Sequence, residues 1–188
     1  MLEYDRCRDR VLVKDGHLGG YIQGGDSLTQ CPTTWDFFLN LGVKSFLDIG
    51  CGEGQAMKYF ADRDCEVCGI EGCSEAIRKH VMPSRVLNHD YRNGPLEMIP
   101  YDLVWCCEVL EHIEEEFLPN VRMEGKFIAI SPATVGQKGH HHVNCQLPEY
   151  WINVMQLRGR RLAPEITKAS KIGLDPKNYY ARNGMVFI

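Results

Sequence analysis

The stretch that decides the fold is Ser45-Phe-Leu-Asp-Ile-Gly-Cys-Gly-Glu-Gly-Gln55. Apolar residues come first, three closely spaced glycines follow, and the chain continues into Ala56-Met-Lys-Tyr-Phe60. This order predicts a buried strand, a tight turn and the first turns of a helix. Glycines in such a turn leave backbone N–H groups uncovered at the helix N-terminus, where a ligand can approach closely.

The spacing of the glycines and the charge beside them narrow the choice of ligand. The dinucleotide fingerprint is G-x-G-x-x-G, with its third glycine where the helix packs on the strand. Here the spacing is G-x-G-x-G, and the acid Asp48 stands two residues before Gly50. A carboxylate does not favour a pyrophosphate, but it does favour a ligand that carries an ammonium and a sulfonium group. The turn therefore predicts S-adenosylmethionine as the ligand.

The segment Asp48-Ile-Gly-Cys-Gly-Glu-Gly54 resembles motif I of the class I S-adenosylmethionine-dependent methyltransferases. That resemblance implies a Rossmann-like α/β fold, a mostly parallel sheet with helices on both faces. It also implies S-adenosylmethionine as cofactor and S-adenosylhomocysteine as product. The cofactor-binding residues implied within this segment and just after it are Asp48, Gly50, Cys51, Gly52 and Gln55.

Two acids further along the chain fit the same resemblance. Glu71 ends an apolar run about 20 residues after the turn, where a nucleotide-binding βαβ unit carries its ribose-binding acid. Asp90 follows a third, short apolar run. In class I methyltransferases the first acid holds the ribose hydroxyls and the second lies near the adenine amino group. The resemblance implies these roles for Glu71 with Gly72 and for Asp90 with Tyr91; the alternative for Asp90 is a turn-forming residue.

Length and composition are those of one globular domain. The chain has 188 residues, and we expect an N-terminal arm over residues 1–30 and a single domain over residues 31–188. A net charge of −4 gives no global signature of nucleic-acid binding. No apolar run has the length of a signal peptide or a membrane span. Nine scattered cysteines are typical of reduced thiols, so we expect a cytoplasmic enzyme without a membrane partner.

The N-terminal arm contains two Gly-Gly pairs that flank Tyr21-Ile-Gln23. This composition suits a bent segment that lies over another part of the molecule. Two interpretations remain open, a flexible arm and a lid that contributes Tyr21 and Asp26 to the ligand cleft. An aromatic residue between glycine pairs is unusual in a mere tail, which favours the lid.

Strand-like and helical patterns alternate along the rest of the chain. Because parallel strands are joined by helices, this alternation predicts a parallel sheet with the ligand at the carboxyl ends of its strands. We expect helices over residues 32–41, 55–62, 74–80 and 148–157, and a basic helical piece near 168–171. Strands are expected over residues 45–49, 66–71, 84–88, 101–107, 127–130 and 185–188, with a weak one near Leu162.

Chemistry-bearing side chains follow the fourth of these strands, whose last residue is Cys107. Tyr101–Cys107 resembles motif IV of the family, which implies that Cys107 lies at the cofactor. Glu108, Glu111 and His112 have helical spacing, so a helix that starts at the strand end would place all three on one face. Two carboxylates and an imidazole suit a divalent cation such as Mg²⁺ or Mn²⁺. They equally suit a general base with an orienting acid.

The loop after the fifth strand carries three adjacent histidines, His140, His141 and His142. Strands four and five are neighbours in this fold, so one of these histidines can complete the set; we assign His141 to catalysis and His142 to the metal. E-x-x-E-H with a downstream His resembles the metal site of small-RNA terminal 2′-O-methyltransferases. A related E-x-x-E-H occurs in ubiquinone-biosynthesis O-methyltransferases. The alternative is that His112 only lines the cleft.

The expected reaction is an in-line transfer of a methyl group, in which alignment of the acceptor does much of the work. An alcohol acceptor must also lose a proton, to a neutral His or through a metal-lowered pKa. The histidines therefore favour O-methylation of a small molecule or sugar. Alternatives are an RNA 2′-O-methyltransferase, with basic candidates at 158–161 and 168–171, and a non-catalytic cofactor-binding module. The chain also resembles a group of short microbial and phage methyltransferases, a resemblance that implies no substrate. It is carried by the combination of Gly-Gly-Tyr-x-x-Gly-Gly-Asp (19–26), Cys-Glu-Val-Leu-Glu-His (107–112), His-His-His-Val-Asn (140–144) and Glu-Tyr-Trp (149–151).

Overall fold

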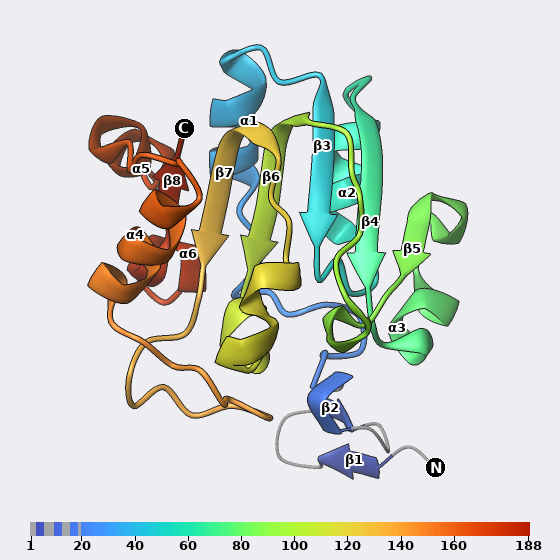
Figure 1. Cartoon of the computed structure of the whole chain (residues 1–188). Coiled ribbons are helices and arrows are strands. Elements are labelled where there is room, and N and C mark those ends of the chain that lie inside the picture. The colour runs from blue at the N-terminus through green and yellow to red at the C-terminus, as the bar shows by residue number, and fades with distance from the viewer. Residues whose placement is uncertain (1–2, 6–9, 13–15, 19) are drawn as a thin grey trace.

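The computed structural model describes residues 3–5, 10–12, 16–18 and 20–188. A six-stranded sheet forms its centre, with the strand order β5-β4-β3-β6-β7-β8 (Figure 1). All neighbouring pairs are parallel except β7 and β8, which are antiparallel. The strands are β3 (Ser45–Ile49), β4 (Glu66–Glu71), β5 (Val86–Asn88), β6 (Tyr101–Cys107), β7 (Gly125–Ser131) and β8 (Met185–Phe187). The predicted Rossmann-like sheet is confirmed.

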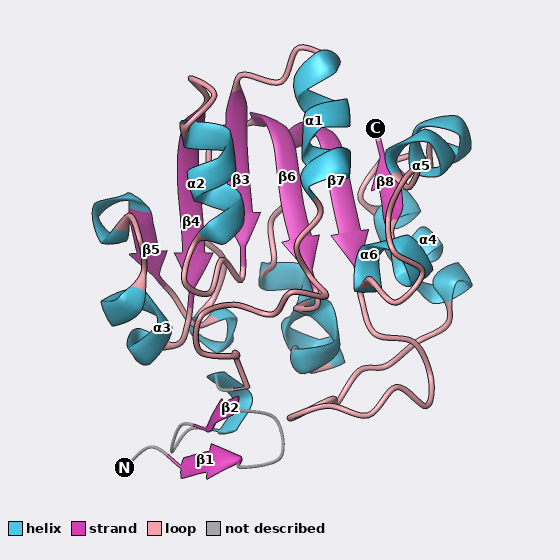
Figure 2. Ribbon diagram, turned by 180° about the vertical axis from the view of Figure 1, so that it is seen from behind, coloured by secondary structure: helices cyan, strands magenta, loops and turns pink. Residues whose placement is uncertain are grey.

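Helices cover both faces of this sheet because its central strands are apolar on both sides. On one face lie α1 (Pro32–Asn40) and α2 (Gln55–Ala61), in front of the sheet in Figure 2. Their core includes Phe46 and Phe60, whose rings stack with centroids 3.9 Å apart. On the other face Leu47 belongs to a second core that includes Trp151 of α4 (Pro148–Leu157). The remaining helices are α3 (Ser74–Lys79), α5 (Pro164–Ser170) and α6 (Tyr179–Asn183).

Most element boundaries agree with the sequence patterns. Strands β4 and β6 and helix α4 have the predicted bounds, and Pro32 is the first residue of α1. Helix α3 begins at Ser74 as expected and ends at Lys79, one residue before the predicted end. The helix expected from Glu108 onward is wrong. Glu108 has a left-handed φ of 56°, and only a short 3-10 helix follows, Leu110–His112.

The outer side of β8 is covered by the segment before α5. Leu162 forms a bridge with Phe187, as the weak strand expected there predicts. The Ile188 N–H donates to the Arg161 carbonyl at 2.9 Å. The Val186 N–H donates to the Thr167 hydroxyl at 2.9 Å.

The N-terminal part of the chain lies beyond the carboxyl ends of the strands (Figure 1). It includes a small antiparallel pair that the sequence did not predict, β1 (Glu3–Asp5) and β2 (Arg10–Leu12). Within the described ranges, no helix is both long and apolar enough to cross a membrane. The first thirty residues thus include segments positioned near the edge of the sheet at which a ligand is expected.

Candidate active site

A cleft opens at the carboxyl ends of β3, β4 and β6 and divides into two adjoining pockets. One, which we call the acidic pocket, is lined by five carboxylate residues, Asp26, Asp48, Glu53, Glu108 and Glu111. The other, which we call the Glu71 pocket, lies on the β4 side. Six residues line both pockets and mark their junction: Gly20, Tyr21, Gly50, Gly52, Glu108 and His112.

The glycine turn between β3 and α2 forms the floor of the cleft, and its shape requires glycine. Gly50 has a φ of 73°, and a Cβ there would lie 2.3 Å from Cγ2 of Val109. Gly54, with a φ of 87°, is in contact with the buried His80, whose Nε2 would lie 2.2 Å from an added Cβ. Side chains other than hydrogen are therefore excluded on both conformational and steric grounds. Cys51, Gly52 and Gln55 of this turn line the acidic pocket.

Glu71 lies at the end of β4, and its carboxylate faces the glycine turn. One oxygen accepts the Gly52 N–H at 2.8 Å, and the other accepts the Cys73 N–H at 2.8 Å. Burial raises the pKa of Glu71, although these hydrogen bonds oppose the shift. Gly72 also lines the Glu71 pocket, and a Cβ there would lie 2.5 Å from Leu18.

Asp90 also lines the Glu71 pocket, and its carboxylate makes two different contacts. Its carboxylate accepts the Arg92 N–H at 2.9 Å and so caps a short turn. The second oxygen lies 2.9 Å from Nε2 of His17, a residue of the N-terminal arm. The buried Tyr91 lines the same pocket. A turn-forming role and a place in the ligand pocket are thus compatible in this fold.

Asp48 is the acid that distinguishes this turn from a dinucleotide fingerprint. It is 5% exposed and lines the acidic pocket together with Tyr21, Asp26 and Cys107. Burial and then the charge of Glu71 raise its pKa well above the ordinary value. A buried carboxylate of this kind is stabilised by a cation, which is the property that motif I requires here.

The arm is fastened to the glycine turn by hydrogen bonds at Gly24. Its N–H donates to Glu53 at 3.0 Å, and its carbonyl accepts from the Gln55 side chain at 3.2 Å. Glu53 is 9% exposed and lines the acidic pocket. Glu53 was not among the residues predicted from the sequence, although its position between two glycines of the turn was a signal.

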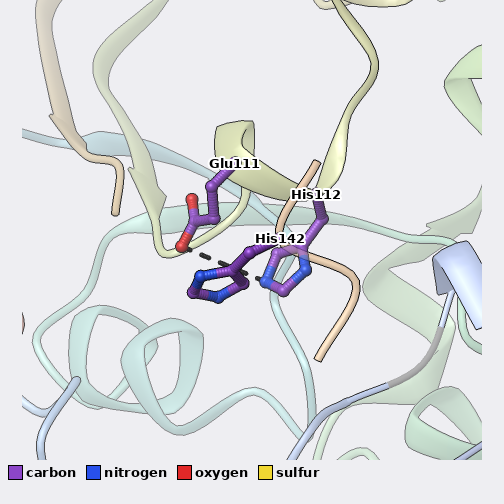
Figure 3. Close-up of side chains that lie close together, drawn as sticks. All are labelled: Glu111, His112 and His142. Atoms are coloured by element: carbon purple, nitrogen blue, oxygen red, sulfur yellow. Dashed lines mark ion pairs between the residues drawn. The ribbon is translucent and has the colours of Figure 1, made fainter. Parts of the chain in front are cut away.

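The chemistry-bearing cluster consists of Glu111, His112 and His142 (Figure 3). Each offers a ligand atom, and these three atoms lie within 4.8 Å of one another. Glu111 is fully buried, and neither of its carboxylate oxygens has a hydrogen-bond partner in the part of the chain that the structure describes. Nε2 of His112 lies 4.0 Å from Oε1 of Glu111.

The environment sets the charge of this cluster. Burial, followed by the charge of Glu108, raises the pKa of Glu111 well above its ordinary value. Burial, followed by repulsion from His142 and His140, lowers the pKa of His112 to about 3. His112 is therefore a neutral imidazole at pH 7, the form in which histidine binds a metal.

Glu108 stands outside this three-residue cluster although it was predicted within it. Its left-handed backbone separates it from the short 3-10 helix, so the expected shared helical face does not form. Its carboxylate instead accepts from Gln137 at 2.7 Å and from the Ser131 hydroxyl at 3.3 Å. Burial raises the pKa of Glu108 to about 7. Glu108 still lines both pockets.

The three loop histidines have different surroundings. Nδ1 of His142 lies 2.9 Å from the Gln137 carbonyl oxygen, and its ring is 5.0 Å from that of His112. His141 has a φ of 45° and its Nε2 lies 3.5 Å from Glu114. His140 bonds to the carbonyl of Gly16 in the arm. The structure thus brings His142 to the cluster and does not bring His141 to it.

Two arginines of the basic segment 158–161 bind backbone carbonyl groups. Arg158 donates to the Val121 carbonyl at 2.7 Å and to that of Leu118. Arg160 donates to the Gly125 carbonyl at 3.0 Å and pairs with Glu124. Both guanidinium groups are thus engaged in holding the loop that enters β7.

Comparisons of the sequence with known proteins find methyltransferases. Residues 47–122 match the family model described as "Methyltransferase domain". The ubiquinone biosynthesis O-methyltransferase of Stutzerimonas stutzeri (strain A1501) is 34% identical over 89 residues, 43% of this chain and 38% of that protein. The mitochondrial one of Schizosaccharomyces pombe is 37% identical over 81 residues, 38% of this chain and 30% of that protein. The matches thus span less than half of these relatives.

Solved structures share the fold at low sequence identity. The plantazolicin methyltransferase BpumL in complex with SAH has a TM-score of 0.52 and 18% identity, over 85% of this chain and 81% of that one. The methyltransferase domain of bacterial-CtHen1-CN has a TM-score of 0.52 and 15% identity, over 85% and 96%. The [4+2]-cyclase SpnF has a TM-score of 0.52 and 14% identity, over 89% and 84%.

Likeness to a cyclase shows that this fold alone does not fix the reaction. Three further observations bear on the reaction: the glycine turn with its preceding acid, the order of the strands and the match to the methyltransferase domain model. They involve the same part of the chain, so they are stronger evidence for a methyltransferase than the fold alone. Residues 47–122 thus resemble a methyltransferase domain, and the whole chain shares the fold of solved methyltransferases.

Proposed function

We propose that this protein transfers the methyl group of S-adenosylmethionine to a hydroxyl oxygen of a small molecule or sugar. The observation that carries the proposal is the junction of the two pockets, where Glu108 and His112 line both and Glu111 and His142 lie beside them. Relatives named O-methyltransferases support oxygen as the acceptor atom.

The division of the cleft matches the two parts of the cofactor. The adenosine fits the Glu71 pocket, with Glu71 toward the ribose and Asp90 toward the adenine. The methionine part fits the acidic pocket, where Lys138 is the single Lys or Arg residue among the lining residues described. The acidic side chains of this pocket favour a ligand with ammonium and sulfonium groups, because a nearby cation stabilises the ionised form of a buried carboxyl group. The methyl group then lies at the junction, next to His112.

The cluster of Glu111, His112 and His142 is suited to a divalent cation. Its donor set is one carboxylate and two imidazoles, which first-row divalent metals accept. The two unpartnered oxygens of a fully buried Glu111 are the strongest sign that a positive group belongs there. When bound, such an ion supplies Lewis acidity that lowers the pKa of an acceptor hydroxyl. We therefore propose Mg²⁺ or Mn²⁺ as a second cofactor.

The chain's own residues align the acceptor and receive its proton. Glu108 lines both pockets, so we assign it to take the hydroxyl proton. As the new oxygen–carbon bond forms, the sulfur–carbon bond breaks and neutral S-adenosylhomocysteine leaves. Hydrogen bonds from Gln137 and Ser131 fix the orientation of the Glu108 carboxylate during this step.

We also propose that residues 16–30 act as a lid over the cofactor. Tyr21 lines both pockets, and Gly24 is bonded to Glu53 and Gln55 of the glycine turn. His17 bonds to Asp90, which lines the Glu71 pocket. A segment held on both sides of the cleft excludes water from the junction when closed. The cytoplasmic location stays a prediction of the sequence.

Incubation with methyl-labelled S-adenosylmethionine tests the proposal. The acceptor source is a cell extract divided into RNA, polysaccharide, protein and small-molecule fractions, each with divalent metal or with chelator. We expect label in the small-molecule or polysaccharide fraction, lost in chelator and restored by Mg²⁺ or Mn²⁺. His142→Ala should lose the label, whereas His141→Ala, one residue away and outside the cluster, should keep it.

Other results would redirect the assignment. Label confined to RNA would make the protein an RNA 2′-O-methyltransferase. We expect this outcome less because Arg158 and Arg160, two of the basic residues considered for RNA binding, bind backbone carbonyl groups instead. Full labelling in chelator would refute the metal. Tight binding of S-adenosylhomocysteine without label in any fraction would favour a non-catalytic cofactor-binding module.

A further inference from the structure

A third concavity lies apart from the cofactor cleft, beside β8. It has a volume of about 440 Å³ and is bounded by the start of the loop after β7 and by α4, α5 and α6. Figures 1 and 2 both show these helices gathered at the β8 edge of the sheet. We call it the basic pocket. Its volume lies within the range of small-molecule sites.

The lining of the basic pocket is mainly apolar. Trp151 and Ile152 of α4 contribute to it, together with Leu162 and Met185. Trp151 is 1% exposed, and its indole Nε1–H has no hydrogen-bond acceptor among the residues that the structure describes. The Trp151 ring therefore forms part of the apolar wall of the basic pocket.

The charge of the pocket has one sign. Lys168, Lys171 and Arg182 line it, and its described lining contains no Asp or Glu. Lys171 is only partly exposed, and burial lowers its pKa. Arg182 lies over the ring of Tyr179 at 5.0 Å. In a chain with a net charge of −4, three cations around one apolar hollow indicate an anionic occupant.

The basic pocket and the acidic pocket are separated by a hydrogen-bonded wall. Asn183 lines the basic pocket and donates to the Gln137 side chain at 3.1 Å. Gln137 in turn donates to Glu108 at 2.7 Å, on the side of the cofactor cleft. The basic pocket is therefore separate from the cofactor cleft, and the side chains of Asn183 and Gln137 connect it to the proposed catalytic residue Glu108.

We propose that the basic pocket binds a small amphipathic anion, a carboxylate or phosphate joined to an apolar body. The apolar body packs against Trp151, Ile152 and Leu162. The anionic group is held by Lys168, Lys171 and Arg182, in charge-assisted hydrogen bonds. This inference goes beyond the proposed methyl transfer and does not depend on it.

Four eight-carbon probes test the pocket: octanoate, octyl phosphate, octanol and octylammonium. Binding is followed by NMR on the indole N–H signals of ¹⁵N-labelled protein, with the Trp151 signal assigned through Trp151→Phe. We expect octanoate and octyl phosphate to shift the Trp151 signal and to leave that of Trp35, in the acidic pocket, unchanged. Octanol and octylammonium should bind about tenfold more weakly or not at all. The tighter of the two anions identifies carboxylate or phosphate.

A charge-matched pair of variants tests the cationic side chains. Lys168→Gln/Lys171→Gln should weaken octanoate about tenfold. The control Lys126→Gln/Lys177→Gln removes two exposed lysines elsewhere and should bind octanoate as the original protein does. S-adenosylhomocysteine binding reports that each variant is folded.

Three results would overturn the proposal. The first is octylammonium or octanol binding as tightly as octanoate, a comparison that needs no variant. The second is a probe that shifts the Trp35 signal instead of the Trp151 signal. The third is a short RNA oligonucleotide that competes for the lysines without shifting the Trp151 signal, which would make these lysines an RNA-binding surface.

Discussion

Replacement of Gly50 by alanine tests why the glycine turn has its sequence. Gly50 has a φ of 73°, and its new Cβ would lie 2.3 Å from Cγ2 of Val109. Gly52 has a φ of 54°, but no atom lies within 4 Å of an added Cβ. The two substitutions therefore share the backbone strain and differ in the clash.

The magnitudes follow from these two geometries. A left-handed backbone conformation costs alanine roughly 1–2 kcal/mol. Alanine also lowers the conformational entropy of the unfolded chain, which offsets part of this cost, so Gly52→Ala should lower the free energy of unfolding by about 1 kcal/mol. Gly50→Ala adds overpacking of ~1–3 kcal/mol, for a total of about 3 kcal/mol. Val109→Ala removes both clashing methyl groups at a cost of about 1 kcal/mol, since the side chain is only partly buried.

The double variant gives the decisive comparison. Because Val109→Ala relieves the clash, Gly50→Ala/Val109→Ala should be more stable than Gly50→Ala alone, with a coupling energy of about 2 kcal/mol. Urea unfolding of the four variants without cofactor measures this. Additive losses, or equal losses for Gly50→Ala and Gly52→Ala, would refute the reasoning that contact with Val109 fixes glycine at this position.

Three further predictions concern side chains that satisfy backbone groups. Asp102 accepts two backbone N–H groups at the start of β3, which lower its pKa, so Asp102→Asn should cost about 1 kcal/mol at pH 7. Because the folded-state pKa of Asp102 is lowered, its carboxylate stabilises the fold above the unfolded-state pKa of 3.8, and this stability is lost as the pH falls through the folded-state pKa. The difference in free energy of unfolding between the original protein and Asp102→Asn, measured with urea, should therefore vanish below pH 3.8. Asn178 is buried, and its side chain caps α6 by accepting two backbone N–H groups. Asn178→Ala should therefore lower the free energy of unfolding, measured with urea, by about 2 kcal/mol. A loss of less than half of that would contradict a stabilising role of this cap. Thr167→Val leaves the Val186 N–H without its acceptor and should cost about 1–3 kcal/mol in the same assay, whereas Thr167→Ser should retain most of the stability.

The sheet and the cofactor turn could be predicted because their determinants are local. An apolar strand followed by G-x-G-x-G is a continuous pattern, and the strand, the turn and the helix that it predicts are all found. Central parallel strands are buried on both faces, so β4 and β6 are recognisable by the apolar runs 67–70 and 103–107 within them.

The candidate catalytic site was less predictable because contacts distant in sequence decide it. The spacing of Glu108 and Glu111 implied a shared helical face, but hydrogen bonds from Gln137 and Ser131 accompany a left-handed Glu108 instead. Three adjacent histidines look alike in sequence, and only the folded loop distinguishes His142. A period of 3.6 residues holds only where a helix exists, and here the chain makes a single 3-10 turn.

The covering of β8 has a consequence for how this molecule behaves in concentrated solution. An edge strand with unpaired N–H and C=O groups is a template on which another chain can add, which is a common start of aggregation. Here the outward N–H groups of Val186 and Ile188 are already bonded to Thr167 and Arg161. Because the segment before α5 and the Thr167 hydroxyl already bind these backbone groups, another molecule cannot use them to add a strand at this edge.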